Sequence, residues 1–264
     1  MGLELQVAAV QDVLPLGAPV RLEISLKNVS DTALPAPESL NMKYGCVSGR
    51  VVDSAGNVRT FNPLILCVDE VTLKYMEPGD HISESITLLR GAEGALFPSA
   101  GSYTIEVEVT WDLYGGHVGL SNQVNVFVTT AQTASHARAA MKVLNTPDTL
   151  LSLVLTGDHL TEGNAAIQAA LTDEVLRPHY AYIEAKRLAQ PFRKRKANLE
   201  AAADLLDEDT VMNAAEVRKC TKLANQAGTG DSAAQDKMTT VLRAKAKSKA
   251  DAMPEKGTNT LVTH

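Results

Sequence analysis

The sequence is poor in aromatic residues and in cysteine, and it has no long apolar run. Aromatic residues make up 4% of the 264 residues, so the core has to be built mainly from aliphatic side chains and alanine. Three cysteines without regular spacing argue against a disulfide framework and against a zinc site. Cys46 and Cys67 can pair only if their strands are neighbours. No run of about 18 apolar residues occurs, which predicts that no helix crosses a membrane.

The beginning of the sequence resembles a strand and not a targeting segment. Met1 to Val7 carry neither the basic region nor the apolar core of a signal peptide. We therefore expect a cytoplasmic protein, although a secreted protein that has lost its signal peptide fits the same sequence. The triplet Asn28-Val29-Ser30 matches a glycosylation sequon, but a turn explains it better than a modified surface site.

The spacing of apolar residues changes near Gln132. Before it, apolar and polar residues alternate, as in Val20–Lys27, where the pattern predicts a strand with one apolar and one polar face. After it, apolar residues recur every three or four positions in an alanine-rich background, which predicts amphipathic helices. Net charge changes at the same place: 7 Lys and Arg against 15 Asp and Glu give −8 up to Ala131, and 18 against 16 give +2 afterwards. We predict a β-domain at 1–130, a helical domain at 131–254 and a disordered tail at 255–264.

The first half contains frequent turns between short alternating segments. Asp53–Asn57 and Gly115–Gly119 each predict a hairpin turn. In Phe97–Tyr103, a turn places a tyrosine at the start of a strongly alternating strand, where its hydroxyl is expected to bond back to the turn. Seven or so short strands with such turns are typical of a β-sandwich.

Several of these segments resemble a known module. They are Leu16–Val20 leading to Ile24–Ser30, the corner from Pro98 to Tyr103, and the closing Ser-Asn-x-Val-x-Val strand at Ser121–Val126. Together they look like the immunoglobulin-like sandwich at the front of many bacterial multidomain proteins. In outline they are also similar to bacterial intracellular proteinase-inhibitor domains. The resemblance implies a fold and not an activity, so no functional residue is carried over.

The second half predicts short helices with small residues at their contacts. The expected helices are Ser135–Asn145, Leu150–Leu155, one opening at Thr161, Arg177–Gln190, Lys194–Leu206, Glu208–Ala227, and one after Gly228–Asp231 that runs to about Met253. Short antiparallel helices of this kind loosely resemble a tetratricopeptide-type array. A plain helical bundle is the alternative, because the characteristic residues of that repeat do not recur at a 34-residue period.

Motifs that carry chemistry are missing from the sequence. It contains no nucleophile elbow, phosphate-binding loop or paired zinc-ligand motif, and its six histidines are scattered. The acidic segment Leu205–Thr210 lacks the glycine and spaced oxygen ligands of a calcium loop, and we interpret it as a helix N-terminus rich in carboxylates. We therefore expect no catalytic residues, no metal and no cofactor, and we do not expect an enzyme.

One basic run is the candidate partner-binding site. Arg193, Lys194, Arg195 and Lys196 place four cations side by side, which suits phosphates or an acidic partner. A solvated helix start or interhelix loop is the alternative. No aromatic residues interleave with the run, so it does not predict a platform for stacked bases.

The function that these observations favour is protein–protein interaction without catalysis, as in a scaffold or adaptor. One alternative is a regulator, inhibitor or cleavage target of an intracellular protease, and another is a secreted or surface structural subunit. The expected partners are proteins, such as a protease or the members of a multi-subunit assembly. Nucleic acid and membrane are not expected, because the acidic first half repels both.

Overall fold

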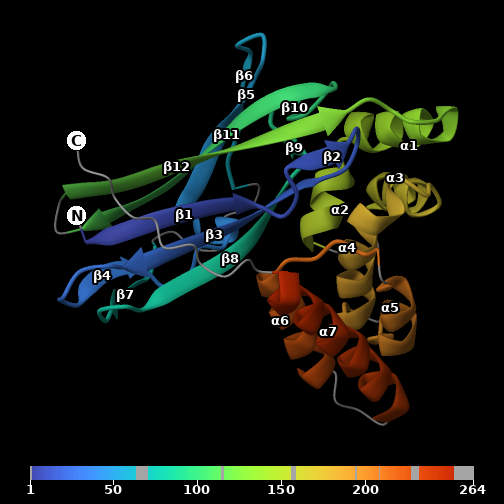
Figure 1. Cartoon of the computed structure of the whole chain (residues 1–264). Helices are drawn as coiled ribbons and strands as arrows, with labels where there is room; N and C mark the ends of the chain where they lie inside the picture. Colours follow the sequence, from blue (N-terminus) through green and yellow to red (C-terminus); the bar gives the residue numbers. More distant parts are fainter. Residues whose placement is uncertain are drawn as a thin grey trace.

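The computed structural model places strands in the first half of the chain and helices in the second (Figure 1). It describes residues 2–63, 71–113, 116–155, 159–193, 195–207, 209–226 and 232–252. The last strand ends at Thr129 and the first helix begins at Ala134, so the change falls where the spacing of apolar residues changes. The predicted order of β then α is confirmed. The expected tail at 255–264 lies outside the described residues.

The strands pair almost entirely with antiparallel neighbours. They are β1 (Leu3–Ala9), β2 (Val13–Pro15), β3 (Val20–Asn28), β4 (Leu34–Pro37), β5 (Val47–Asp53), β6 (Val58–Phe61), β7 (Leu73–Met76), β8 (His81–Leu88), β9 (Arg90–Gly91), β10 (Gly94–Ala95), β11 (Gly101–Leu113) and β12 (Gly116–Thr129), with a 3₁₀ turn η1 at Met42–Tyr44. Within the described residues, one sheet has the order β1-β3-β8 and a larger one the order β2-β12-β11-β5-β6. Among the described strands, only β2 runs parallel to a neighbour, which is β12. Two further ribbons pair β4 with β7 and β9 with β10.

The two larger sheets share one aliphatic core. Leu22, Ile24 and Leu26 of β3 are fully buried and belong to the same cluster as Val107 and Val109 of β11. Burying each such side chain contributes about 1.5–3 kcal/mol. Alternation in both strands therefore directs one face of each sheet into a common interior, as the period of two requires.

Two of the predicted turns are confirmed by their hydrogen bonds. The Tyr103 hydroxyl donates to the carbonyl of Ser99 at 2.7 Å, so it does bond back to the preceding turn. In the hairpin between β5 and β6, the Asp53 carboxylate accepts from the backbone N–H groups of Ala55 and Asn57. The prediction for Gly115–Gly119 needs correction. Residues 116–119 belong to β12 and pair with β11, and residue 115 lies outside the described residues.

The sequon contains a buried asparagine. Asn28 is 0% exposed, and its side-chain amide donates to the carbonyls of Thr32 and Met76 at 2.8 Å each. Its oxygen accepts from the backbone N–H of Ser30. The amide nitrogen is thus committed to holding a turn, in agreement with the interpretation made from the sequence.

The helices begin close to their expected positions with two exceptions. They are α1 (Ala134–Asn145), α2 (Thr149–Leu155), α3 (Thr161–Leu171), α4 (Arg177–Ala189), α5 (Leu199–Leu205), α6 (Ala214–Gln226) and α7 (Ser232–Ala252). The expected start of α5 at Lys194 is wrong, because Asn198 caps the helix by accepting from the N–H of Ala201. The expected start of α6 at Glu208 is also wrong: Asn213 and Glu216 form a capping box there, each side chain accepting from the other's backbone N–H at 2.8 Å.

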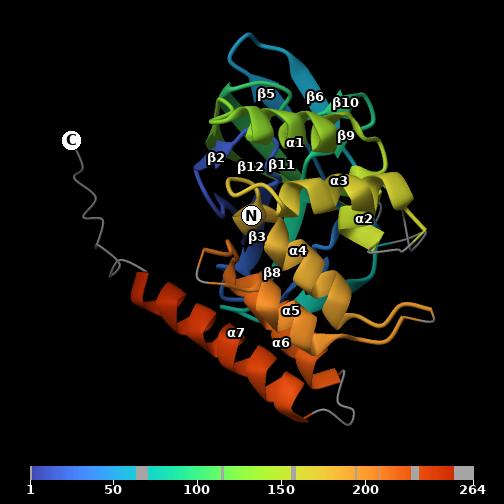
Figure 2. The same ribbon diagram turned by 90° about the vertical axis from the view of Figure 1, so that its right-hand side faces the viewer.

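The helices pack against the sheets through a continuous core. In Figure 2 they lie in front of the strands, with α1 beside β10 and α6 beside β8. Buried residues of both halves form a single cluster, which includes Leu88 of β8, Val143 of α1 and Tyr180 of α4. The end of the polar face of β3 that carries Arg21 is therefore covered, whereas Lys27 at the other end is exposed. Arg21, on the face that alternation predicts to be polar, is 2% exposed because the helical half covers it.

Candidate functional site

A buried polar network joins the two halves. The Arg21 guanidinium of β3 lies 2.8 Å from the Glu216 carboxylate of α6 and also donates to the carbonyl of Val211 at 2.7 Å. The other oxygen of Glu216 accepts from the Ser85 hydroxyl of β8 at 3.1 Å, and that hydroxyl accepts from the Asn213 amide at 3.0 Å. The side chains of Arg21 and Glu216 are 2% and 1% exposed, so water does not screen the pair. The network fixes the start of α6 on the sheet.

A second set of contacts ties the linker and α4 to the turn between β2 and β3. The backbone N–H of Gln132 donates to His136 Nδ1 at 3.1 Å, so Nε2 carries the proton and donates to the carbonyl of Leu16 at 2.8 Å. The Tyr180 hydroxyl donates to the neighbouring carbonyl of Gly17 at 2.7 Å. The junction between the last strand and the first helix is thus held by hydrogen bonds of two buried side chains, His136 and Tyr180.

The predicted basic run forms the loop between α4 and α5. Arg193 and Lys196 are exposed, whereas Lys194 lies outside the described residues. Arg195 is half-buried, and its guanidinium donates to the carbonyl of Arg187 near the end of α4 at 3.0 Å. Of the two alternatives for this run, the interhelix loop is correct and the helix start is wrong. The described residues of the run differ in role, because Arg195 holds the loop while Arg193 and Lys196 face solvent.

An aromatic ring organises this loop. The guanidinium carbons of Arg193 and Arg195 lie 5.4 Å and 5.8 Å from the centroid of the Phe192 ring. The His159 ring stacks on the same phenyl ring with centroids 6.3 Å apart. We refer to Phe192, Arg193, Arg195 and His159 as the Phe192 cluster. Phe192 directly precedes the basic run in the sequence, and this adjacency is the signal from which its contact with the arginines could have been predicted.

Arg193 has an unusual backbone conformation. Its φ of 52° makes it the only non-glycine residue with positive φ in the described part of the chain. A side chain held in the left-handed region costs on the order of 1–3 kcal/mol and persists only where its surroundings impose it. The local reason here is the bridge between Phe192 and Arg195, whose backbone groups bond to each other in both directions.

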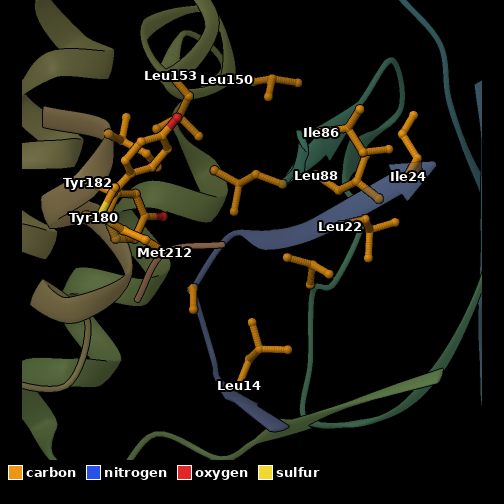
Figure 3. Packing of buried hydrophobic residues seen from close by; sticks show 14 of the residues in the cluster. Leu14, Leu22, Ile24, Ile86, Leu88, Leu150, Leu153, Tyr180, Tyr182 and Met212 are labelled. Atoms are coloured by element: carbon orange, nitrogen blue, oxygen red, sulfur yellow. The ribbon is translucent and has the colours of Figure 1, made fainter. Parts of the chain in front are cut away.

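A cleft lies where β8 meets the helices. Its volume is about 450 Å³. Ile86 and Leu88 of β8 line one side, and Leu150 and Leu153 of α2 line another; these four side chains are labelled in Figure 3. Phe61, at the end of β6, adds an aromatic surface. We call this space the junction cleft, because strands and helices both contribute to its wall.

Four cations also line the junction cleft. Lys43, Arg90, Lys186 and Lys219 come from η1, the start of β9, α4 and α6, and no described lining residue is acidic. Lys219 has a distant carboxylate outside the lining, with 3.8 Å between its nitrogen and Glu84 Oε1. All charged side chains in the described lining are therefore cationic, in a chain whose net charge is −6.

Lys186 is the most perturbed of these cations. Burial of its ammonium group lowers its pKa to about 8, and the positive charge of Lys219 acts in the same direction. Its nitrogen donates to the carbonyl of Leu153 at 3.5 Å. No ion pair within 4 Å neutralises it among the residues that the structure describes. No sequence motif marks this lysine, because its neighbours in the cleft come from distant segments.

His179 should make the stability of the fold depend on pH. Burial lowers its pKa to about 4, and the charges of Arg21 and His136 add to the effect. The unfolded chain takes up this proton near pH 6.5 and the folded one only near pH 4, so the contribution is complete above about pH 6.5 and is lost as pH falls. The free energy of unfolding should drop by up to about 3 kcal/mol over this range. Urea unfolding at pH 7, 5.5 and 4.5 measures the drop.

The matched variant for this prediction is His179→Gln, which has no proton to gain. The free energy of unfolding of this variant should fall less between pH 7 and 4.5 than that of the wild type, and the difference is the contribution of the His179 imidazole. If the two proteins lose stability in parallel between pH 7 and 4.5, the assignment to His179 is wrong.

The described residues of the acidic segment Leu205–Thr210 are the last residue of α5 and the loop that follows it, so the interpretation of the segment as a helix N-terminus is wrong. One oxygen of Asp207 accepts from the Thr210 hydroxyl at 2.8 Å, and the other accepts from Arg177 of α4 at 2.9 Å. The carboxylate therefore closes a turn and pairs with a neighbouring helix. Glu208 lies outside the described residues.

Metal-binding and thiol groups give no further site. No group of three or more His, Cys, Asp or Glu side chains arranged to hold a metal occurs among the described residues. Cys46 is a free, buried thiol that donates to the carbonyl of Ser39, and burial raises its pKa to about 11. Cys67 lies outside the described residues. In the described part of the chain, no helix combines the length and apolar character needed to cross a membrane.

Comparisons with known proteins identify no family. No family model and no curated protein matches the chain. A β-glucosidase from Listeria innocua in complex with glucose is 14% identical, with a TM-score of 0.29 over 48% of this chain and 16% of that one. The β-glucosidase EmGH1 from Erythrobacter marinus is 16% identical, with a TM-score of 0.28 over 48% and 15%. The chain therefore spans less than a fifth of either enzyme.

A third solved structure is matched over a larger share of its length. Spo0M, a sporulation control protein from Bacillus subtilis, is 11% identical, with a TM-score of 0.31 over 57% of this chain and 56% of that one. Likenesses at these TM-scores carry no argument about fold or activity. Function has to be inferred from the geometry of the chain itself.

Proposed function

We propose that this protein is a non-catalytic interaction protein, a scaffold or adaptor, and that its Phe192 cluster contacts an acidic surface of a protein partner. The observation that carries the proposal is the backbone of Arg193. Left-handed conformations of non-glycine residues concentrate at functional sites, where the surrounding structure imposes the strain. Here the strain holds an exposed arginine beside an aromatic ring, with Lys196 exposed on the same loop.

The contacts around the loop support a preorganised binding surface. Arg195 is hydrogen-bonded to α4, and His159, which comes from a different interhelical segment, stacks on the Phe192 ring. The Phe192 ring and its two arginines therefore have little conformational freedom to lose on binding. Arginine over an aromatic ring combines charge with a flat apolar surface, a combination enriched at protein interfaces. The Arg21–Glu216 network supports the same function, because it makes one rigid unit from the two halves.

We also propose that the first half is an immunoglobulin-like sandwich. Its two larger sheets share a core, and the Tyr103 corner has the hydrogen bond expected of that fold. The second half suits a short helical array, because sequence neighbours such as α4 and α5, or α6 and α7, pack together. Both architectures commonly bind proteins, and this supports the interaction function by analogy only.

Site-specific cross-linking tests the proposed contact. A photoreactive amino acid at position 196 should cross-link the chain to one discrete protein in an extract of the cells that make it. The matched control is position 142, because Lys142 is an exposed lysine on α1, away from the loop. Adding Arg193→Glu should abolish the product from position 196, because it puts a negative charge against the acidic partner.

A glycine variant separates binding from stability. Arg193→Gly relieves the strained backbone, so the free energy of unfolding should stay the same or rise by up to about 1 kcal/mol, while cross-linking from position 196 is lost. Equal products from positions 142 and 196, or a product that survives both substitutions at position 193, would contradict the proposed contact.

A further inference from the structure

The junction cleft has the size and lining of a small-molecule site. Its volume of about 450 Å³ falls within the usual range of ligand pockets, roughly 300–1,000 Å³. Ile86 and Leu88 come from a strand and Leu150 and Leu153 from a helix, so an occupant would meet apolar side chains from more than one direction (Figure 3). Ser85, which lines the cleft, also belongs to the Arg21–Glu216 network, so the network holds β8 to the start of α6 beside the cleft.

Three of the cleft's four cations have no ion-pair partner among the described residues, although the negative charges of Glu216 and Glu84 act on Lys186 at longer range. Lys43, Arg90 and Lys186 form no ion pair within 4 Å with any described carboxylate, and Lys219 has only the 3.8 Å contact with Glu84. Lys43 and Lys219 are exposed, whereas burial desolvates the ammonium group of Lys186, so an anion that reaches Lys186 gains more than it would at an open surface. The lowered pKa of Lys186 reflects this environment.

From this combination we infer that the junction cleft binds a small amphiphilic carboxylate, in which an apolar chain of roughly eight to twelve carbons ends in the anionic group. The chain would lie against the wall made by Leu88, Leu150 and Leu153, and the carboxylate would accept hydrogen bonds from Lys186 and its neighbouring cations. A cationic amphiphile of the same length fits the wall but is repelled by the lining. The finite volume favours a small molecule over an extended peptide. The inference concerns a different surface from the Phe192 cluster and does not rest on the proposed function.

Calorimetric titration of the full chain with decanoate, below its micelle-forming concentration, tests the inference. Acetate supplies the carboxylate without the chain, and decyltrimethylammonium supplies the chain with the opposite charge. Decanoate should bind at least about tenfold more tightly than either probe, because only decanoate satisfies both parts of the lining.

Two substitutions and a matched control connect binding to the cleft. Lys186→Met keeps an unbranched apolar stem and removes the charge, so it should weaken decanoate binding by about tenfold or more. Leu155→Asp places a competing carboxylate at the exposed edge of the cleft and should weaken binding without burying a charge, because Leu155 is 36% exposed. Lys142→Met, on the exposed face of α1, should leave the affinity unchanged. Far-ultraviolet circular dichroism of each variant verifies that it is folded.

Several results would overturn the inference. They are equal affinity for decanoate and decyltrimethylammonium, an affinity that Lys186→Met and Leu155→Asp leave unchanged, and absence of binding at millimolar decanoate. Binding of an acidic, leucine-rich peptide in place of decanoate would assign the cleft to a protein segment and would also overturn it.

Discussion

Replacing Glu216 by glutamine is expected to lower the free energy of unfolding by about 3–5 kcal/mol. The variant keeps the shape of the side chain and its ability to accept from Asn213, so the capping box survives in large part. What it removes is the negative charge 2.8 Å from Arg21, whose side chain is 2% exposed. The guanidinium would then be buried without a counter-ion. Urea unfolding monitored by circular dichroism measures the loss.

The matched control is Glu106→Gln, which breaks an ion pair on the surface of the larger sheet. Glu106 pairs with Arg50 at the same distance of 2.8 Å, but the Arg50 side chain is 55% exposed. The control should cost less than about 1 kcal/mol, because water already solvates both groups. Similar losses in the two variants would show that the buried pair does not hold the halves together.

A double variant separates the cost of a lone charge from the value of the contact. Arg21→Met with Glu216→Leu removes both charges, so it should be more stable than Glu216→Gln even though it deletes more hydrogen bonds. A double variant that is less stable than Glu216→Gln would indicate that the hydrogen bonds of the network, and not its charges, dominate.

Gly17→Ala is expected to destabilise the protein by about 3 kcal/mol or more. Gly17 has a φ of 87°, and a Cβ atom added to it would lie 2.6 Å from Ala140 Cα and 2.7 Å from Ala140 Cβ. The first of these atoms is helix backbone, which cannot move without shifting α1 away from the turn. Thermal and urea unfolding both measure the effect.

Gly56→Ala is the control that isolates packing from backbone strain. Gly56 has a φ of 84°, and an added Cβ would meet nothing within 4 Å. Its cost should be near 1 kcal/mol, which is the conformational term alone. The excess loss at Gly17 then measures how tightly the β2–β3 turn packs on α1, and no excess would contradict the close approach.

The sequence predicted turns and helices well where they depend on residues that are close together along the chain. The turn before Tyr103, the Asp53–Asn57 hairpin and most helices follow from residues that are close in sequence. The start of α6 could also have been predicted, because Asn213 and Glu216 have the spacing of a capping box. The predicted start at Glu208 was too early, because it relied on the carboxylates at 207–209. In the structure Asp207 belongs to a loop and pairs with Arg177.

The candidate sites were predictable only in part. Composition pointed to the run from Arg193 to Lys196, and the structure places Arg193 and Lys196 at the surface of a loop. The contact of Phe192 with His159 was not predictable, because the two residues belong to different interhelical segments. The junction cleft could not be predicted from the sequence, because no two of its cations lie close together along the chain.

By itself, the sequence determined the order of the two halves, the alternating core of the strands and the acidic balance of the first half, because periodicity and charge are local and additive. Only the tertiary structure decided what happens to the polar face of β3. Arg21 has the pattern of a solvent-facing residue, and it is buried because Glu216, 195 positions away, supplies the opposite charge. An ion pair of this kind depends on which surfaces meet, and periodicity along one strand contains no information about the surface that will cover it.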